Sequence, residues 1–192
     1  MLKKNAEVVN FLLNRRSRPA KTLMGPAPTQ DELRVLLTAA ARTPDHGKLE
    51  PWRFMVFEEK SLKRLVDLTN KRGEQLDKPP EKLLKTITAL QTGATMVAVV
   101  FSPRESIKIP EVEQILSAGA VCLSLLNVAL ASGWGANWLT DWIATERVFL
   151  KQGLGLTDEE FVAGYIHIGT ESIVPPERPR PNIEKITTWI SS

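Results

Sequence analysis

Hydrophobic residues recur at helical spacing in some stretches of this chain and follow strand patterns in others. Helical patterns predict helices at residues 6–14, 62–72, 81–90 and 145–152. A further helix begins at the capping-box sequence Thr29-Gln30-Asp31-Glu32 and ends near Arg42. The helices at 62–72 and 81–90 have charged outer faces, so we expect solvated surface there and no site.

Three stretches predict strands. Residues 52–58 place Trp52, Phe54 and Val56 on one side and Arg53, Met55 and Phe57 on the other, which predicts a strand with at least one buried face. Residues 95–101 form a continuous run of apolar, mainly β-branched residues. A continuous run is typical of a strand covered on both faces, so we expect 95–101 at the centre of the sheet. Residues 161–169 predict a further strand, in which we expect His167 to be half-exposed. No second metal-ligating side chain lies at ligand spacing from His167, so no metal site is expected.

These elements predict an α+β fold with a mixed, mostly antiparallel sheet surrounded by helices. Strands and helices are not regularly interleaved, and no Gly-x-Gly-x-x-Gly or P-loop motif is present, which argues against a doubly wound nucleotide-binding fold. No internal repeat divides the chain. Its 192 residues fit a single domain spanning 1–192.

The stretch from Gln114 to Thr140 contains no charged residue and is long enough to span a bilayer. Small and polar residues interrupt it, and Gly133-Trp134-Gly135 ends the helical pattern early. We therefore predict a long helix buried in protein and no membrane span. Because this helix is apolar all round, we expect it to pack on other helices, including those of a second subunit.

Composition narrows the possible partners. The chain is 43% hydrophobic and 24% charged, with a net charge of +3 and a pI near 9.1. The extra basic residues are spread along the chain, so small-anion binding is favoured over nucleic-acid binding. A single cysteine, Cys122, excludes an intrachain disulfide and predicts a small buried hydrophobic side chain. No signal peptide is recognisable, and we expect a cytoplasmic location.

The turn between the helix ending near Arg42 and the strand beginning at Trp52 is rich in functional side chains. Arg42, His46 and Lys48 supply hydrogen-bond donors, and the neighbouring carboxylates supply acceptors. Connections of this kind, held between two rigid elements, often carry binding sites. We expect this turn to contribute to a cofactor site.

Two arginine-rich segments are candidate anion sites. Arg15-Arg16-Ser17-Arg18 follows the first predicted helix, where the charges could simply stabilise the helix end, or could bind a phosphate through guanidinium groups and a hydroxyl. Both interpretations stay open. Near the C-terminus, Arg178 and Arg180 lie in a proline-rich, extended stretch, and their spacing places both side chains on one side.

Four landmarks together give the chain a family resemblance. They are Asn14-Arg15-Arg16-Ser17; Ala41-Arg42-Thr43-Pro44-Asp45-His46 with Glu50-Pro51-Trp52; Ser117-Ala118-Gly119-Ala120 through Gly133-Trp134-Gly135-Ala136-Asn137-Trp138; and Gly164-Tyr165-Ile166-His167-Ile168-Gly169. In this order and at these separations, they resemble the nitroreductase family of FMN-dependent NAD(P)H oxidoreductases, particularly its compact single-domain members. The resemblance covers nearly the whole chain.

The resemblance implies a homodimer with FMN bound in clefts at the subunit interface. The resemblance implies no catalytic side chain. The residues that match the family's motifs are expected to contact the cofactor. These are Arg15, Arg16 and Ser17 at the phosphate and ribityl chain, Arg42 and His46 at the flavin, Trp138, Leu139 and Thr140 after the long helix, and Arg178 and Arg180 at the phosphate.

This chain departs from the family's pattern at two positions. Larger members have a lysine near the flavin N1 and O2 atoms where this chain has Pro19, so Arg18, Arg42 or His46 would have to supply the positive charge. Glu50 stands before Pro-Trp, where glutamine is usual, which puts a hydrogen bond to the flavin edge in doubt.

The implied activity is a ping-pong reaction in which NADH or NADPH passes hydride to flavin N5 and a nitroaromatic, quinone or related small molecule is then reduced. In such an enzyme the hydride chemistry belongs to the flavin, and the protein binds and orients the reactants. A protein that binds or sequesters flavin without turnover is the alternative. A basic nucleic-acid module is a third reading, supported only by the pI and the arginines.

Overall fold

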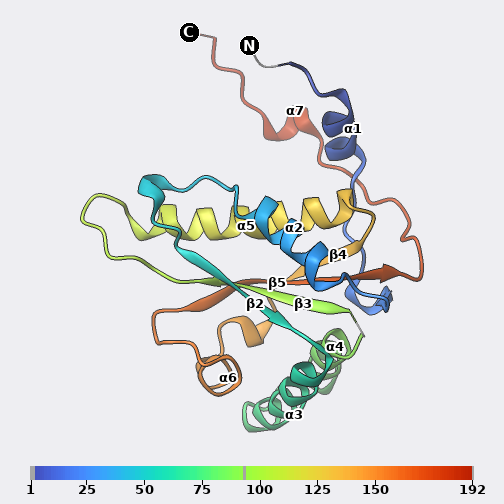
Figure 1. Cartoon of the computed structure of the whole chain (residues 1–192), viewed down its shortest axis with the longest axis vertical. Helices are drawn as coiled ribbons and strands as arrows, with labels where there is room; N and C mark the ends of the chain where they lie inside the picture. Colours follow the sequence, from blue (N-terminus) through green and yellow to red (C-terminus); the bar gives the residue numbers. More distant parts are fainter. Residues whose placement is uncertain (1–2, 93, 192) are drawn as a thin grey trace.

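The computed structural model describes residues 3–92 and 94–191, and its centre is one five-stranded sheet (Figure 1). Its strands are β1 (Leu23–Met24), β2 (Trp52–Phe57), β3 (Thr95–Phe101), β4 (Gly135–Leu139) and β5 (Phe161–Glu171). The strand order is β1-β5-β3-β2, and β4 also pairs with β5. Every pairing among the described strands is antiparallel, which confirms the mostly antiparallel character of the predicted sheet, while the parallel pairing that a mixed sheet would contain is not seen among these strands.

The central strands are β3 and β5, as the continuous apolar run at 95–101 predicts. β3 is buried from Met96 to Phe101, and its register places Val97 opposite Ile166. The expected half-exposure of His167 is wrong: its side chain is only 3% exposed. The reason is that β5 has neighbours along both edges and helices on both faces, so it has no solvent-facing side in this region.

One face of the sheet is covered by α5 (Glu111–Ala131) and α2 (Gln30–Ala40). Their buried side chains pack on β3 and β5 residues, including Val97, Val99 and Ile166. The predicted capping box at the start of α2 is present, because Glu32 N donates to Thr29 Oγ1 and Thr29 N donates to Glu32 Oε2. Cys122 of α5 is fully buried, as expected, and burial raises the pKa of its thiol to about 12.

The opposite face is covered by α3 (Glu59–Gln75), α4 (Pro80–Leu90) and the short α6 (Arg147–Phe149), which continues into a π-helical turn at Leu150–Leu154. A second cluster of buried residues, among them Met96, Val100 and Tyr165, fills the space between these helices and the sheet. Three short 3₁₀ turns, at Ala20–Thr22, His46–Lys48 and Trp142–Ala144, complete the connections.

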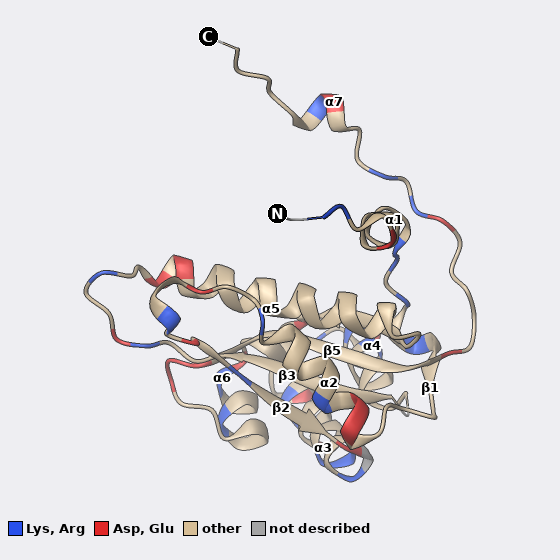
Figure 2. Cartoon of the chain, turned by 45° about the horizontal axis from the view of Figure 1, so that its top comes forward, with Lys and Arg blue, Asp and Glu red and all other residues tan. Residues whose placement is uncertain are grey.

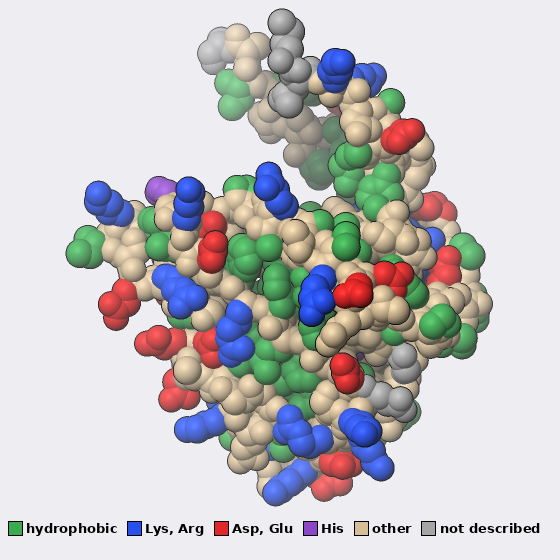
Figure 3. Space-filling model, in the orientation of Figure 1, with side chains coloured by type: hydrophobic (Ala, Val, Ile, Leu, Met, Phe, Trp, Pro, Cys, Tyr) green, Lys and Arg blue, Asp and Glu red, His purple; other side chains and the backbone are tan. Residues whose placement is uncertain are grey.

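The two terminal helices lie outside the packed sheet and its covering helices. α1 (Ala6–Asn14) and α7 (Ile183–Ile186) contain no buried residue, and both lie above α5 in Figures 1 and 2. Their exposed apolar side chains include Leu12, Leu13 and Ile186. Figure 3 shows hydrophobic side chains on α1 and on the body across the space that separates them.

The helix α5 is buried on one side only. Val112, Leu116 and Leu123 on its outer side are exposed by 59%, 67% and 44%. By length and composition α5 is also able to cross a membrane, and 44% of its most apolar stretch is buried within the chain.

Candidate functional site

The arginine-rich segment after α1 is held against the outer edge of β4. Arg18 N donates to the Ala136 carbonyl at 2.8 Å, and Asn137 Nδ2 donates to the Arg18 carbonyl at 2.6 Å. The Arg18 side chain forms an ion pair with Glu171 at the end of β5. These contacts fix the backbone that carries Arg15, Arg16 and Ser17.

The C-terminal tail returns to the same place. The Arg16 guanidinium donates to the Pro176 carbonyl, and Arg180 Nη2 lies 3.5 Å from the Arg15 carbonyl. Arg180 also forms an ion pair with Glu177 at 2.8 Å. Figure 2 shows basic residues of both segments at one end of α5. Residues from the two ends of the sequence therefore lie together within one chain.

Arg15 is the least satisfied member of this group. Its Nη2 donates to Ser17 Oγ at 3.2 Å, but its Nε is buried and has no hydrogen-bond partner within the described residues. Burial, and then the neighbouring charge of Arg180, lower the pKa of Arg15. A buried cation beside another cation is stabilised by an anion that accepts hydrogen bonds from it. The group Arg15, Ser17 and Arg180 thus has the chemistry of a phosphate or carboxylate site.

Arg178 is not part of this group. Its side chain is exposed, and within the described residues only Arg180 of the predicted pair approaches the Arg15 segment.

The connection between α2 and β2 is fastened to α5. Thr43 Oγ1 and Ser124 Oγ lie 2.9 Å apart, and Ser117 Oγ donates to the Pro44 carbonyl at 3.1 Å. Trp52 Nε1 donates to the same Ser117 oxygen at 3.2 Å. Two uncharged serines on one side of the apolar helix therefore position the predicted cofactor turn.

The structure distinguishes the three cations that could stand in for the family's lysine. Arg18 is paired with Glu171, and His46 Nδ1 lies 2.7 Å from Glu113 Oε2. Arg42 is exposed and has no ion pair among the described residues. Of the three, Arg42 has a charge that is not neutralised by a neighbour.

The residues Trp138, Leu139 and Thr140 face three different environments. The Trp138 ring packs under α5 against Gly164 and Cys122, and its Nε1 donates to the Ala163 carbonyl at 3.3 Å. Leu139 lines a small cavity on the other face, and Thr140 is exposed.

The backbone of Trp138 faces outward from the sheet. Since the Ala136 carbonyl points away from β5 to Arg18, the alternation of an antiparallel strand turns the Trp138 amide and carbonyl to the same outer edge. The segment therefore offers a ligand its backbone groups, while the Trp138 side chain belongs to the core.

One chain does not bring all of the predicted contacts together. Arg15, Arg16, Ser17 and Arg180 lie beside β4, near the end of α5, whereas His46 contacts Glu113 in the first turn of that helix. Glu113 and Ala131 are about 27 Å apart along a helix axis at 1.5 Å per residue. The predicted site thus consists of two half-sites separated by α5.

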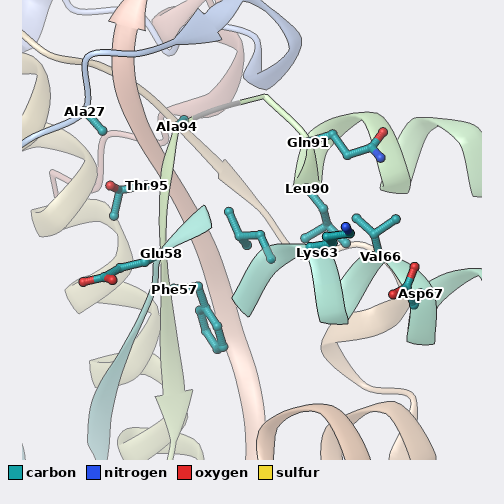
Figure 4. Close-up of a pocket in the computed structure, with 11 residues that line it drawn as sticks. Ala27, Phe57, Glu58, Lys63, Val66, Asp67, Leu90, Gln91, Ala94 and Thr95 are labelled. Carbon is teal, nitrogen blue, oxygen red and sulfur yellow. The ribbon is translucent and has the colours of Figure 1, made fainter. Parts of the chain in front are cut away.

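A separate cavity of about 500 Å³ lies on the opposite face, between β2, β3, α3 and α4 (Figure 4). Its floor is formed by buried apolar side chains such as Phe57, Leu62 and Leu90, and its rim carries the exposed Lys63 and Asp67. None of the predicted cofactor residues lines it.

Sequence reasoning missed several partners of the predicted residues. Glu113 contacts His46, and Glu171 pairs with Arg18. Asp141, the residue after Thr140, accepts a hydrogen bond from Thr86. Asp141 directly follows the predicted contact segment 138–140, so its position in the sequence is a signal, whereas Glu113 and Glu171 are far from their partners in the sequence. No local pattern identifies them.

The comparisons with known proteins agree with this architecture. Residues 12–170 match the model of the Nitroreductase family. The chain is 28% identical over 167 residues to "Putative NAD(P)H nitroreductase YdjA" of Escherichia coli (strain K12), covering 87% of this chain and 90% of that protein. It is 32% identical over 166 residues to the "Putative NAD(P)H nitroreductase" of Haemophilus influenzae, covering 85% and 88%.

Two solved structures share the fold. The "Nitroreductase-like Family Protein from Bacillus cereus" superposes with a TM-score of 0.76 at 23% identity, over 100% of both chains. A "putative nitroreductase in complex with fmn" from Desulfovibrio desulfuricans superposes with a TM-score of 0.75 at 22% identity, over 99% of this chain and 100% of that one.

Proposed function

This chain belongs to the nitroreductase family of FMN-dependent oxidoreductases, and we propose that it is a homodimer that binds FMN between its subunits and reduces a small molecule with NAD(P)H. The expected acceptors are nitroaromatics, quinones and related compounds. The names of its relatives, and the FMN complex of one structural neighbour, favour this activity over the binding of nucleic acid.

The observation that carries the proposal is the Arg15 group. A buried guanidinium nitrogen without a partner, next to the Ser17 hydroxyl and a second guanidinium, fits the terminal phosphate of FMN. The Arg180 side chain forms an ion pair with Glu177 in this structure, and we expect it to turn toward the phosphate when the cofactor binds.

The outer face of α5 supports a two-subunit site. Val112, Leu116, Gly119 and Leu123 follow one another at spacings of four, three and four residues, which places them in a single apolar seam. When two copies of α5 pack antiparallel about a two-fold axis, the start of one helix lies beside the end of the other. The Arg15 group of one subunit then approaches the Arg42 and His46 turn of its partner.

Arg42 is the residue we assign to the position of the family's missing lysine. Arg42 has no ion pair within the described residues, whereas Arg18 is paired with Glu171 and His46 Nδ1 lies against Glu113 Oε2. A cation at the pyrimidine edge of the flavin stabilises the negative charge that develops there on reduction.

When bound, FMN would supply the hydride chemistry of both half-reactions. The chain supplies binding and orientation. Arg15, Ser17 and Arg180 hold the phosphate, the outer edge of β4 offers the Trp138 backbone, and Arg42 contributes the positive charge. The protons that accompany reduction of the acceptor can come from water, so we assign no catalytic side chain.

The visible spectrum of the purified protein tests the proposal. We expect yellow protein, or colourless protein that becomes yellow with added FMN, and loss of the yellow absorbance when NADH or NADPH is added without oxygen. Protein that takes up no FMN would refute the proposed function. Protein that holds FMN but is bleached by neither nucleotide would establish the alternative of a flavin-binding protein without turnover.

Removing the Arg15 side chain should weaken FMN binding. Hydrogen bonds to charged groups contribute roughly 1.5 to 3 kcal/mol, so Arg15→Ala should raise the FMN dissociation constant about 10- to 100-fold. Fluorescence titration with FMN measures this change. Arg34→Ala is the matched control, because Arg34 is an exposed arginine of α2 paired only with Asp31. Equal FMN affinity in Arg15→Ala and wild type would reject the phosphate role.

A further inference from the structure

Asp141 lies in a backbone conformation that only glycine adopts easily. Asp141 comes directly after β4 and the exposed Thr140, and it has a φ of 51° and a ψ of 174°. A residue with a Cβ atom stays in this region only when its surroundings hold it there, and such residues are concentrated at functional sites. The contacts of the Asp141 side chain show what holds it.

Both carboxylate oxygens of Asp141 are used. Oδ1 accepts a hydrogen bond from the Trp142 backbone N at 2.6 Å, and Oδ2 accepts one from Thr86 Oγ1 at 2.5 Å. Thr86 Oγ1 also accepts from the indole Nε1 of Trp142 at 3.0 Å. Asp141 has no ion pair within the described residues; the nearby cation Lys78 lies over the Trp142 ring, 5.4 Å from its centroid.

This network connects two elements that are distant in sequence. Thr86 is 2% exposed in the middle of α4, and α4 lies on the face of the sheet opposite α5. Beneath the network is a cavity of about 10 Å³, room for a single water molecule, lined by Leu139, Asp141 and Tyr165 among others. The exit of β4 is thus bound to α4 through one hydroxyl and one carboxylate.

We propose that Asp141 is a positioning residue that, through Thr86, fixes the backbone of residues 138–140 where it faces the flavin. This role rests on the proposed function, because it gives those residues a cofactor to contact. Without the Thr86 hydroxyl, Asp141 loses one of its two anchors, and its unfavourable backbone conformation is free to relax. The backbone of residues 138–140 then shifts relative to Ala136 and Asn137, where the segment that carries Arg15 is fastened to β4.

Thr86→Val tests the role, since valine has the shape of threonine without the hydroxyl. We expect its FMN dissociation constant to rise about five- to tenfold, the loss expected from one hydrogen bond, and the visible circular dichroism of bound FMN to change. Thr86→Ser should restore the affinity to within about twofold because it keeps the hydroxyl. Thr88→Val, an exposed threonine of α4, should bind FMN like wild type.

The outcomes separate this role from the proposed function. If wild type binds FMN, and Thr86→Val binds it with the same affinity and spectrum, the positioning role is wrong while the proposed function stands. If wild type binds no FMN, both are wrong. Should Thr86→Val fail to fold, Asp141→Gly removes both contacts of the side chain in a residue that adopts this backbone conformation without strain, and an unchanged FMN affinity and spectrum in that variant would overturn the role.

Discussion

Replacing Leu123 with glutamate should convert the protein to a monomer that no longer retains FMN. Leu123 is 44% exposed in the single chain and lies in the α5 seam, so the substitution leaves the chain's own core intact. In a two-fold interface each substitution occurs twice. An unpaired buried charge costs about 3 kcal/mol or more, so two raise the dimer dissociation constant by roughly four orders of magnitude.

Light scattering during gel filtration gives the mass, and the visible spectrum of the eluted peak gives the FMN content. Leu84→Glu is the control, because Leu84 is an apolar residue of α4, 65% exposed, on the other side of the sheet. It should remain dimeric and yellow. A Leu123→Glu dimer that keeps its FMN would show that the seam is not the interface, and a monomeric wild type would refute the homodimer itself.

The second large effect is a loss of stability in acid that depends on His167. Burial lowers the pKa of this histidine from 6.5 to about 4. Between these values the unfolded chain binds a proton that the folded chain does not, so the free energy of unfolding falls as the pH decreases from 6.5 toward 4. The full shift corresponds to about 3 kcal/mol, of which about 2 kcal/mol is lost between pH 7.5 and pH 5.

Urea unfolding at pH 7.5 and at pH 5, at one protein concentration, measures this loss. His167→Gln should lose less than about 0.5 kcal/mol over the same interval, because glutamine does not titrate. The interval avoids Glu160, whose pKa is lowered to about 2, mainly by its hydrogen bond to Arg53. The stability from that carboxylate is present above pH 4.5 and is lost only as the pH falls toward 2. An equal loss in wild type and His167→Gln would contradict the prediction.

The regular elements of this fold could be predicted where local pattern and final environment agree. The strand predicted at residues 95–101 is observed with the same bounds, because a buried central strand needs apolar residues on both faces. The helix at Ala6–Asn14 is also observed as predicted. By contrast, β1 and β4 were not predicted as strands. Both are short, and they form because β5 offers them an edge, which no local pattern reveals.

The candidate site was predictable only in its parts. The sequence Arg15-Arg16-Ser17 indicates either a charged helix end or an anion site, but the approach of Arg180 to it depends on the path of the tail. Likewise, the expectation for His167 failed because alternation along a strand shows which residues share a face, and helices on both sides of the sheet bury both faces. The network of Thr86 and Asp141 brings together residues 55 positions apart.

The closeness of the two chain ends has a consequence for biosynthesis. Arg180 contacts a carbonyl 165 positions earlier in the sequence, so the group of Arg15, Ser17 and Arg180 cannot form until Arg180 has left the ribosome. The helix α1 has no buried residue, so it covers no surface of its own chain. If the chain binds FMN as proposed, the complete phosphate group is therefore available to the cofactor only after Arg180 has been synthesised.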